Sequence, residues 1–270
     1  MSRATISRQV VAVAVEALVR EAPYIAFETS GTTGQPKRVK TSLSLLDQEI
    51  EHLATVFGGS KRIVSTVKAR HIYGFLFTAM LPSKLGVARV EPGAQAMSFW
   101  RDHVSSGDLV VSFPDYLRFI ADLNVRFPEN VSVVTSTAPC LPEIWGRMRE
   151  CGVSAMSEVY GSTETGGIGI RDSSDAPFLL FPYYEGTPEG TGLLRTLPDR
   201  QVRPLPLMDR LLWSGPRRVT PVGRSDGAIN IGGEKVHMAH VESIIEAHPH
   251  VQGVEVRLNA AGDRLTARVR

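Results

Sequence analysis

A glycine-rich, polar segment follows a short hydrophobic run near the start of the chain. In FETSGTTGQPKRVK (27–40), hydroxyl residues and glycines fill positions 29–34, and Lys37 comes soon after them. Glycine lets backbone N–H groups turn inward around an anion, hydroxyl groups add further donors, and a lysine supplies positive charge. Residues of these types in this order predict a loop that holds phosphate groups.

Two other interpretations of this loop are open on residue types alone. The common nucleotide-binding P-loop needs Gly-Lys-Ser/Thr after four intervening residues, as in a phosphotransferase. Counted from Gly31, the chain instead has Pro36, Lys37 and Arg38, so this pattern fails at two positions. A solvated turn is the remaining alternative.

The composition predicts a soluble globular protein with a small-molecule partner. The chain has 270 residues, of which 43% are hydrophobic, enough for a sizeable core in one large or two small domains. Its 30 basic and 28 acidic residues nearly balance, which argues against a nucleic-acid partner. Cys140 and Cys151 have neither metal-site spacing nor a disulfide framework, so we expect a cytoplasmic protein.

An apolar run at 10–19 is the one segment that could be mistaken for a targeting sequence. Glu16 interrupts it and no small-residue cleavage site follows, so it predicts a buried helix that begins near Ser7 and ends before Pro23. No run reaches the length of about 18 apolar residues that a membrane span needs.

Short apolar runs alternate with helical patterns through the first 160 residues. The intervening segments have helical spacing, as in 43–57. The strand-like runs lie at 24–28, 62–67, 87–91, 108–113, 131–136 and 154–160. This alternation predicts an α/β fold with a mostly parallel sheet flanked by helices, and a ligand site beyond the carboxyl ends of the strands.

The residue composition and pattern change in the second part of the chain. After Gly161, glycine, proline and hydroxyl residues separate short alternating stretches, which predicts antiparallel strands and loops. The composition changes near Val222, before the turn-rich stretch GRSDGAINIGGEKV, a helix at about 240–247 and a final strand pair. We therefore predict a boundary in the GRSDG turn, with one domain over 1–223 and a small α+β domain over 224–270.

Several longer motifs resemble those of the adenylate-forming superfamily, which includes acyl-CoA synthetases and aryl-acid ligases. TSGTTGQPK (29–37) is similar to the family's phosphate-binding motif, and YGSTETGG (160–167) to its Tyr-Gly-x-Thr-Glu motif. RHIYGF (70–75) resembles the acyl-pocket segment, and TSTAPCLP (135–142) the adenine-side loop, which usually has two glycines before Ala-Pro. VGRSDGAINIGGEKVHMAHVE (222–242) is similar to the hinge. The resemblance implies the family's large N-terminal domain followed by a truncated C-terminal domain.

The resemblance also implies a role for each matching residue. Lys37 would contact the leaving pyrophosphate, and His71 would border the carboxylic acid. Thr163 would donate to the α-phosphate, and Glu164 would ligate Mg²⁺. The pyrophosphate would also be held by Thr29, Ser30, Gly31, Thr32, Thr33 and Gly34. The adenine side of the nucleotide would be framed by Ser136, Thr137, Ala138, Pro139, Tyr160, Gly161 and Ser162. The ribose and phosphates would be reached by Asp209, Arg224 and Lys235, with Asp226 as the hinge.

The implied reaction is attack of a carboxylate on the α-phosphorus of ATP, which gives an acyl adenylate and pyrophosphate. Transfer of the acyl group to a thiol commonly follows. The implied cofactors and co-substrates are ATP, Mg²⁺ and the thiol of CoA or phosphopantetheine. A small carboxylic acid is the implied substrate, and a flat aromatic one is admitted; a carrier protein and a homodimer are further partners that the resemblance leaves open.

Two functions follow from the resemblance. An ATP-dependent acid–thiol ligase is favoured because Lys37, Thr163 and Glu164 are all intact. The alternative is a non-catalytic or impaired protein that binds nucleotide or acyl adenylate, because Lys235 is the last lysine and the family's C-terminal adenylation lysine has no counterpart. Arg38 also replaces an expected glycine, and Leu207-Met208 precede Asp209 where the family has Thr-Gly.

The cysteine, histidine and cationic residues outside these motifs are expected to have structural or solvent-exposed positions. Cys151 is expected to be a buried structural thiol. Four histidines close in sequence are expected at the surface rather than in a metal site: His237, His240, His248 and His250. Four cations are expected to form a solvated rim, with contact to the 3′-phosphate of CoA as the alternative: Lys61, Arg62, Lys68 and Arg70.

Overall fold

The computed structural model describes most of the chain. The described ranges are 23–29, 37–93, 96–205, 207–224, 229–231, 234–259 and 264–270. The helix expected between Ser7 and Pro23 lies outside them, as do residues 30–36 of the glycine-rich loop.

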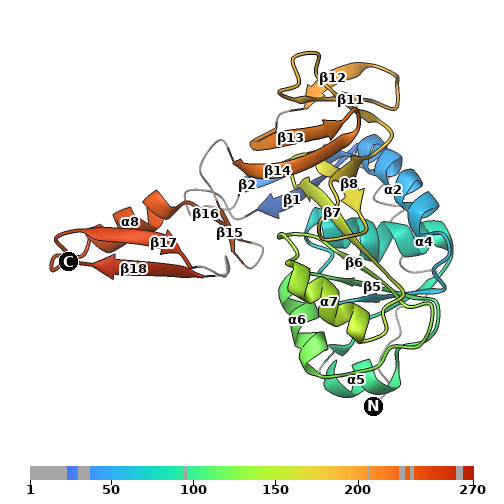
Figure 1. Ribbon diagram of the computed structural model, residues 1–270. Coiled ribbons are helices and arrows are strands. Elements are labelled where there is room, and N and C mark those ends of the chain that lie inside the picture. The colour runs from blue at the N-terminus through green and yellow to red at the C-terminus, as the bar shows by residue number, and fades with distance from the viewer. Residues whose placement is uncertain are drawn as a thin grey trace.

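A nine-stranded sheet with the order β13-β14-β9-β8-β7-β6-β5-β3-β4 forms the centre of the molecule (Figure 1). One half is parallel and consists of β3 (Arg62–Ser65), β4 (Ala88–Val90), β5 (Asp108–Ser112), β6 (Ser132–Thr135) and β7 (Ala155–Ser162). The other half is antiparallel and consists of β8 (Gly166–Arg171), β9 (Phe178–Leu180), β13 (Asp209–Gly215) and β14 (Arg218–Arg224). The expected change to antiparallel strands after Gly161 is confirmed.

Helices cover both faces of the parallel half. One face carries α2 (Leu43–Phe57), α3 (Ile72–Phe75), a π-helical segment η1 (Leu76–Met80) and α4 (Leu81–Leu85). The other carries α5 (Ala96–Asp102), α6 (Pro114–Asp122) and α7 (Pro142–Glu150). Alternate residues of β5 point to opposite faces of the sheet. Leu109 and Val111 pack into the core on the α2 face, and Val110 packs into the core on the α6 face. This is why the central strands read as continuous apolar runs.

Helix α2 has the bounds that its sequence pattern predicts. Ser42 caps its first turn, because the side-chain oxygen accepts from the backbone N–H of Leu45. Leu46, Ile50 and Leu53 follow helical spacing and are at most 4% exposed. Glu49 lies on the same buried face, although it is acidic.

The strand at the start of the described chain does not join the central sheet. β1 (Tyr24–Thr29) pairs antiparallel with β2 (Lys37–Ser42), so the expectation that 24–28 begins the parallel alternation is wrong. The sequence pattern did not predict β2, because Lys37, Arg38 and Lys40 interrupt its β-branched residues. Arg38 and Lys40 are exposed in this two-stranded sheet. The glycine-rich segment 30–36 therefore connects two paired strands.

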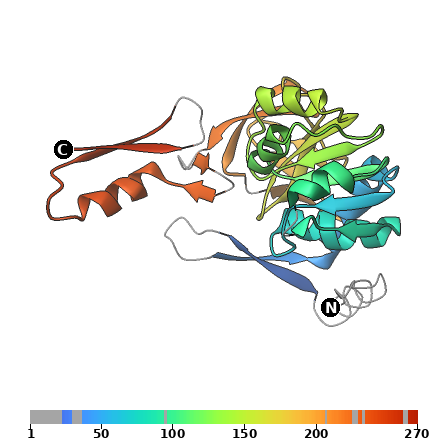
Figure 2. The ribbon, with the colours of Figure 1, turned by 90° about the horizontal axis from the view of Figure 1, so that it is seen from below.

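The remaining strands form three small sheets. One consists of β10 (Tyr184–Gly186), β11 (Leu193–Thr196) and β12 (Val202–Leu205). The others are β15 (Ile229–Ile231) with β16 (Glu234–Val236), and β17 (Val254–Leu258) with β18 (Leu265–Val269). α8 (Met238–Glu246) packs against β17. β17, β18 and α8 extend away from the central sheet (Figures 1 and 2). The boundary predicted in the GRSDG turn stays a prediction, because 225–228 lie outside the described ranges.

None of the helices in the described part of the chain has the length and apolar character needed to cross a membrane.

Candidate functional site

Two predicted binding segments emerge from the same edge of the central sheet. β6 ends at Thr135 and leads into the adenine-side loop, residues 136–139. The neighbouring parallel strand β7 ends at Ser162 and leads into the Thr-Glu turn, residues 163–165. Carboxyl ends of adjacent parallel strands are where ligands bind in folds of this kind.

Tyr160 and Asp209 are brought into contact from positions far apart in the chain. The Tyr160 hydroxyl donates to Oδ2 of Asp209 at 2.7 Å, across a sequence separation of 49 residues. Asp209 is the first residue of β13, and its partner across the strand pair is Arg224 at the end of β14. Two residues predicted to surround the adenine and ribose, Tyr160 and Asp209, are therefore in contact, and the backbone of Arg224 pairs with that of Asp209.

The adenine-side loop is anchored at both ends to β7. The Ser136 hydroxyl donates to the carbonyl of Val159 at 2.8 Å, and the Cys140 N–H donates to Oε1 of Glu158 at 3.0 Å. Glu158 is 4% exposed, and its other oxygen accepts from Nε and Nη2 of Arg171 at 2.8 and 2.6 Å. Burial raises the pKa of Glu158, and Arg171 opposes this shift. Sequence reasoning missed this buried ion pair, although an acid inside an apolar strand is a usable signal.

Thr137 adopts a backbone conformation that threonine rarely tolerates. Its φ is +80°, at a loop position where the resembling family usually has glycine. A β-branched residue in the left-handed region is strained, because its Cβ crowds the backbone.

Replacing Thr137 with glycine is therefore expected to raise the free energy of unfolding by about 1 kcal/mol and the melting temperature by about 2–4 °C. The matched control is Thr220→Gly in β14, where φ is not positive and the added backbone freedom should lower the melting temperature. Differential scanning calorimetry of both variants decides; a lower melting temperature for Thr137→Gly would show that the loop does not store this strain.

The Thr-Glu turn is closed by its own side chains and presents Glu164 outward. Thr165 is buried; its Oγ1 accepts from the Ser162 N–H at 3.0 Å and donates to the Gly166 carbonyl at 2.8 Å. Gly166 has φ +70°, which favours glycine at the end of the turn. Glu164 is exposed in this turn.

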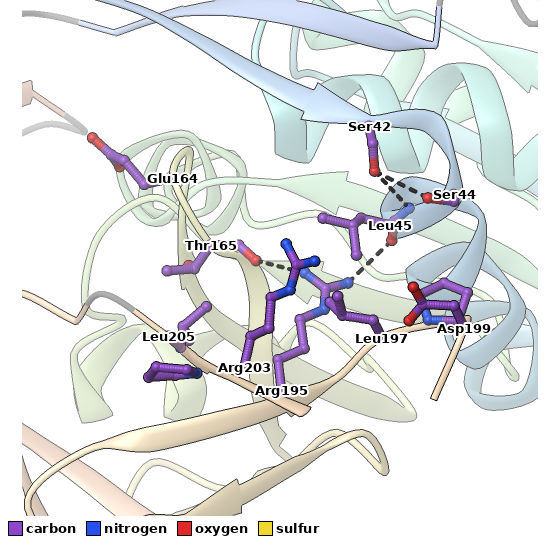
Figure 3. Close-up of a pocket in the computed structure, with 12 residues that line it drawn as sticks. Ser42, Ser44, Leu45, Glu164, Thr165, Arg195, Leu197, Asp199, Arg203 and Leu205 are labelled. Carbon is purple, nitrogen blue, oxygen red and sulfur yellow. Dashed lines mark hydrogen bonds between the residues drawn. The ribbon is translucent and has the colours of Figure 1, made fainter. Parts of the chain in front are cut away.

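Glu164 and Thr165 line a cavity of about 400 Å³ (Figure 3). Its other walls are the start of α2, including Ser42 and Ser44, and residues of β11, β12 and their connection, including Arg203. Arg195 and Arg203 also line the cavity, and the Glu164 carboxylate points away from them (Figure 3). A carboxylate such as that of Glu164 is an oxygen ligand of the kind that Mg²⁺ takes.

His71 lies just before α3. It is exposed, and Nε of Arg70 donates to its Nε2 at 3.1 Å. Tyr73 is buried, and its hydroxyl lies within hydrogen-bond distance of the carbonyls of Ser112 and Val134, at 3.1 and 3.0 Å. These contacts hold the start of α3 against the ends of β5 and β6.

The other predicted site residues are placed by their backbone or lie outside the described ranges. Thr29 and Lys37 pair at the end of the β1–β2 hairpin, and Lys235 lies in β16. The residues outside the described ranges are Ser30, Gly31, Thr32, Thr33, Gly34 and Asp226. Within the described residues, no group of three or more His, Cys, Asp and Glu side chains is arranged to hold a metal.

Curated relatives of the chain are CoA ligases. Two proteins named 4-coumarate–CoA ligase, from Halorhodospira halophila and Cereibacter sphaeroides, are 34% and 36% identical to it, each over 89% of the chain. A 4-chlorobenzoate–CoA ligase from Arthrobacter sp. is 26% identical over 88% of the chain. The chain covers only 61%, 57% and 54% of these relatives' own lengths.

Solved structures share the fold. An o-succinylbenzoate–CoA synthetase from Bacillus subtilis, bound to a product analogue, matches with a TM-score of 0.71 at 18% identity, over 90% of this chain and 58% of that one. An amide bond synthetase from Marinactinospora thermotolerans matches with a TM-score of 0.69 at 19% identity, over 92% of this chain and 59% of that one. The sequence also matches the family described as AMP-binding enzyme over residues 5–187. The chain therefore belongs to the AMP-binding enzyme family, and the resemblance noted in its motifs is confirmed.

Proposed function

We propose that the chain activates a small carboxylic acid with ATP, releases pyrophosphate and passes the acyl group to the thiol of CoA. The hydrogen bond between Tyr160 and Asp209 is the observation that carries this proposal. It joins two motif segments beside the strand ends from which the Thr-Glu turn also projects. The relatives' names, 4-coumarate–CoA ligase and 4-chlorobenzoate–CoA ligase, support the same reaction.

The nucleotide would lie across the ends of β6 and β7. Residues 136–139 and the Tyr160 ring would frame the adenine, with Gly161 and Ser162 beside it. Asp209 would accept from the ribose hydroxyls, and the hydrogen bond from Tyr160 would orient its carboxylate for this purpose. Arg224, opposite Asp209 in the strand pair, would approach the ribose or phosphates.

The protein's main task would be to position two anions in line and offset their charge. Thr163 would donate to the α-phosphate, while residues 29–34 and Lys37 would hold the leaving pyrophosphate. Glu164 would hold Mg²⁺, which supplies charge neutralisation when bound; a solved neighbour with a TM-score of 0.62 was determined with ATP and magnesium. His71 would border the acid, and Lys235 would approach the phosphates.

An aromatic acid is the proposed substrate class. Two kinds of relative are named for aromatic acids, coumarate and chlorobenzoate, although another is named for sulfoacetate. Transfer to a carrier protein, a homodimer and a cytoplasmic location stay predictions. The binding-only alternative is less favoured, because the curated relatives carry the names of ligases.

Exchange of labelled pyrophosphate into ATP tests the proposal. With a panel of aromatic and aliphatic acids, exchange is expected only when an acid is present, and AMP should be the product in the presence of CoA. Binding of a non-hydrolysable acyl-adenylate mimic without exchange would favour the binding-only alternative. ADP as the product would instead indicate a phosphotransferase.

A further inference from the structure

Buried side chains outside the recognised motifs form hydrogen bonds with the backbone of the Thr-Glu turn and of Gly167. The Thr165 carbonyl accepts from the Tyr184 hydroxyl at 3.1 Å and from Nη1 of Arg195 at 3.3 Å. The Gly167 N–H donates to Oε1 of Glu49 at 2.8 Å. The backbone therefore has hydrogen bonds to buried side chains on both sides of Gly166.

Both titratable anchors, the Glu49 carboxyl group and the Arg195 guanidinium, are almost completely buried. Glu49, on α2, is 2% exposed, and Arg195, on β11, is 5% exposed. Arg195 also donates to Oε1 of Gln48 at 3.1 Å and to the carbonyl of Leu45 at 3.2 Å, so it ties α2 to the turn (Figure 3). Its guanidinium lies 4.9 Å from the centre of the Tyr183 ring. These contacts leave Arg195 little freedom to move.

The Glu49 carboxylate packs directly on the backbone of the two glycines that end the motif. A Cβ added to Gly166 would lie 2.4 Å from Oε2 of Glu49, and one added to Gly167 would lie 2.5 Å from Oε1. Glycine at both positions therefore allows the acid to reach the backbone.

Helix α2 also connects this anchor to the glycine-rich loop. It begins at Leu43, immediately after β2, which leads out of segment 30–36. Glu49 lies in the second turn of the same helix. β2 and the first two turns of α2 thus form the continuous stretch of chain between the end of segment 30–36 and the carboxyl group that contacts the Thr-Glu turn.

We infer that Glu49, Arg195 and Tyr184 are positioning residues, which fix the backbone of the turn that carries Thr163 and Glu164. Buried charges cost more free energy than hydrocarbon of the same volume, so an apolar pair would fill this space at lower cost. A polar pair alone can supply the acceptor for Gly167 and the donor for Thr165. The consequence for catalysis rests on the proposed function; the consequence for the turn does not.

Hydrogen exchange of the full chain, followed by mass spectrometry of peptides covering 160–168, tests the placement of the turn. Glu49→Leu is expected to speed exchange of these amides about tenfold, whereas Glu49→Gln keeps an acceptor and should restore protection. Tyr184→Phe removes a single hydroxyl, so it retains the packing and should speed exchange about threefold even if Glu49→Leu does not fold. Wild-type protection in Tyr184→Phe or in a folded Glu49→Leu would overturn the inference.

The control is Arg62→Met. Arg62 donates to both oxygens of Asp108, at 2.8 and 2.5 Å, at the amino ends of β3 and β5, far along the strands from the turn. The Arg62→Met substitution breaks a partly buried ion pair away from the turn and should leave exchange of 160–168 unchanged. Faster exchange in this variant as well would show a general loss of stability and would overturn the inference.

The Mg²⁺ dependence of the reaction rate then distinguishes a positioning role of Glu49 from a general effect on stability. In the pyrophosphate-exchange assay, Glu49→Leu should raise the Mg²⁺ concentration for half-maximal rate about tenfold, and Arg62→Met should leave it unchanged. An unchanged Mg²⁺ dependence in Glu49→Leu would overturn the role in catalysis. If the wild type shows no exchange with any acid, the proposed function fails, and the amide-exchange result alone decides the inference.

Discussion

Replacing Glu164 with glutamine is expected to lower the rate of acid-dependent pyrophosphate exchange by about 100-fold or more. The substitution keeps the size of the side chain and removes the charge that the proposed site offers to a divalent cation. Because Glu164 is exposed, nothing in the core changes, and the melting temperature should stay within about 1 °C of the wild type. The initial rate over a range of Mg²⁺ concentrations is the measurement.

Glu129→Gln is the matched control for this experiment. Glu129 is also an exposed glutamate, but it precedes β6 and so lies at the opposite end of the strands from the proposed site. Its exchange rate should remain within about twofold of the wild type. Equal rates for Glu164→Gln and Glu129→Gln would show that the Glu164 carboxylate takes no part in the reaction.

The stability of the protein is expected to fall between pH 4.5 and pH 7 because of Glu49. Burial raises the pKa of Glu49 from 4.5 to about 7, and the Gly167 N–H and Arg195 oppose the shift. The phenols of Tyr183 and Tyr184 also face this carboxyl group. In this window the folded protein keeps a proton that the unfolded chain has released, so each pH unit costs about 1.4 kcal/mol. The total loss is about 3 kcal/mol, complete above about pH 7.

Urea unfolding of the wild type and Glu49→Gln at pH 4.5, 5.5, 6.5 and 7.5 measures this loss. Glutamine has no proton to release, so the wild type should lose about 3 kcal/mol relative to the variant as the pH rises. Leu53→Ala is the control on the same helix, since it is destabilising but titrates no group. Its difference from the wild type should not change with pH. A constant difference for Glu49→Gln would mean that folding does not perturb this carboxyl group.

The buried strands and helices could be predicted, because their apolar residues recur with the spacing of a strand or a helix. The runs 108–113 and 131–136 became β5 and β6, and 43–57 became α2 with the same bounds. The strand β2 could not be predicted, because a two-stranded sheet buries few side chains and leaves little apolar pattern in a sequence. Local pattern also gave no sign that β1 would pair with it instead of with the central sheet.

The candidate site was predicted only where residues lie within motifs. Tyr160 and Asp209 were assigned separately, and the structure brings them together. Glu49 and Arg195 were missed because each acts through one backbone group of a segment more than 25 residues away in the sequence. A polar side chain at a buried helical position, such as Glu49 between Leu46 and Ile50, was the available signal.

The unbroken path from Ser42 along α2 to Glu49 limits how this part of the chain can vary. One residue inserted or deleted within the first two turns would rotate Glu49 by about 100° around the helix axis and shift it by about 1.5 Å. The carboxylate would then point away from Gly167, whose N–H would lose its acceptor. The seven-residue separation of Ser42 and Glu49 must therefore stay constant for Glu49 to reach Gly167, whereas exposed connections outside the proposed site can change length at a small entropic cost.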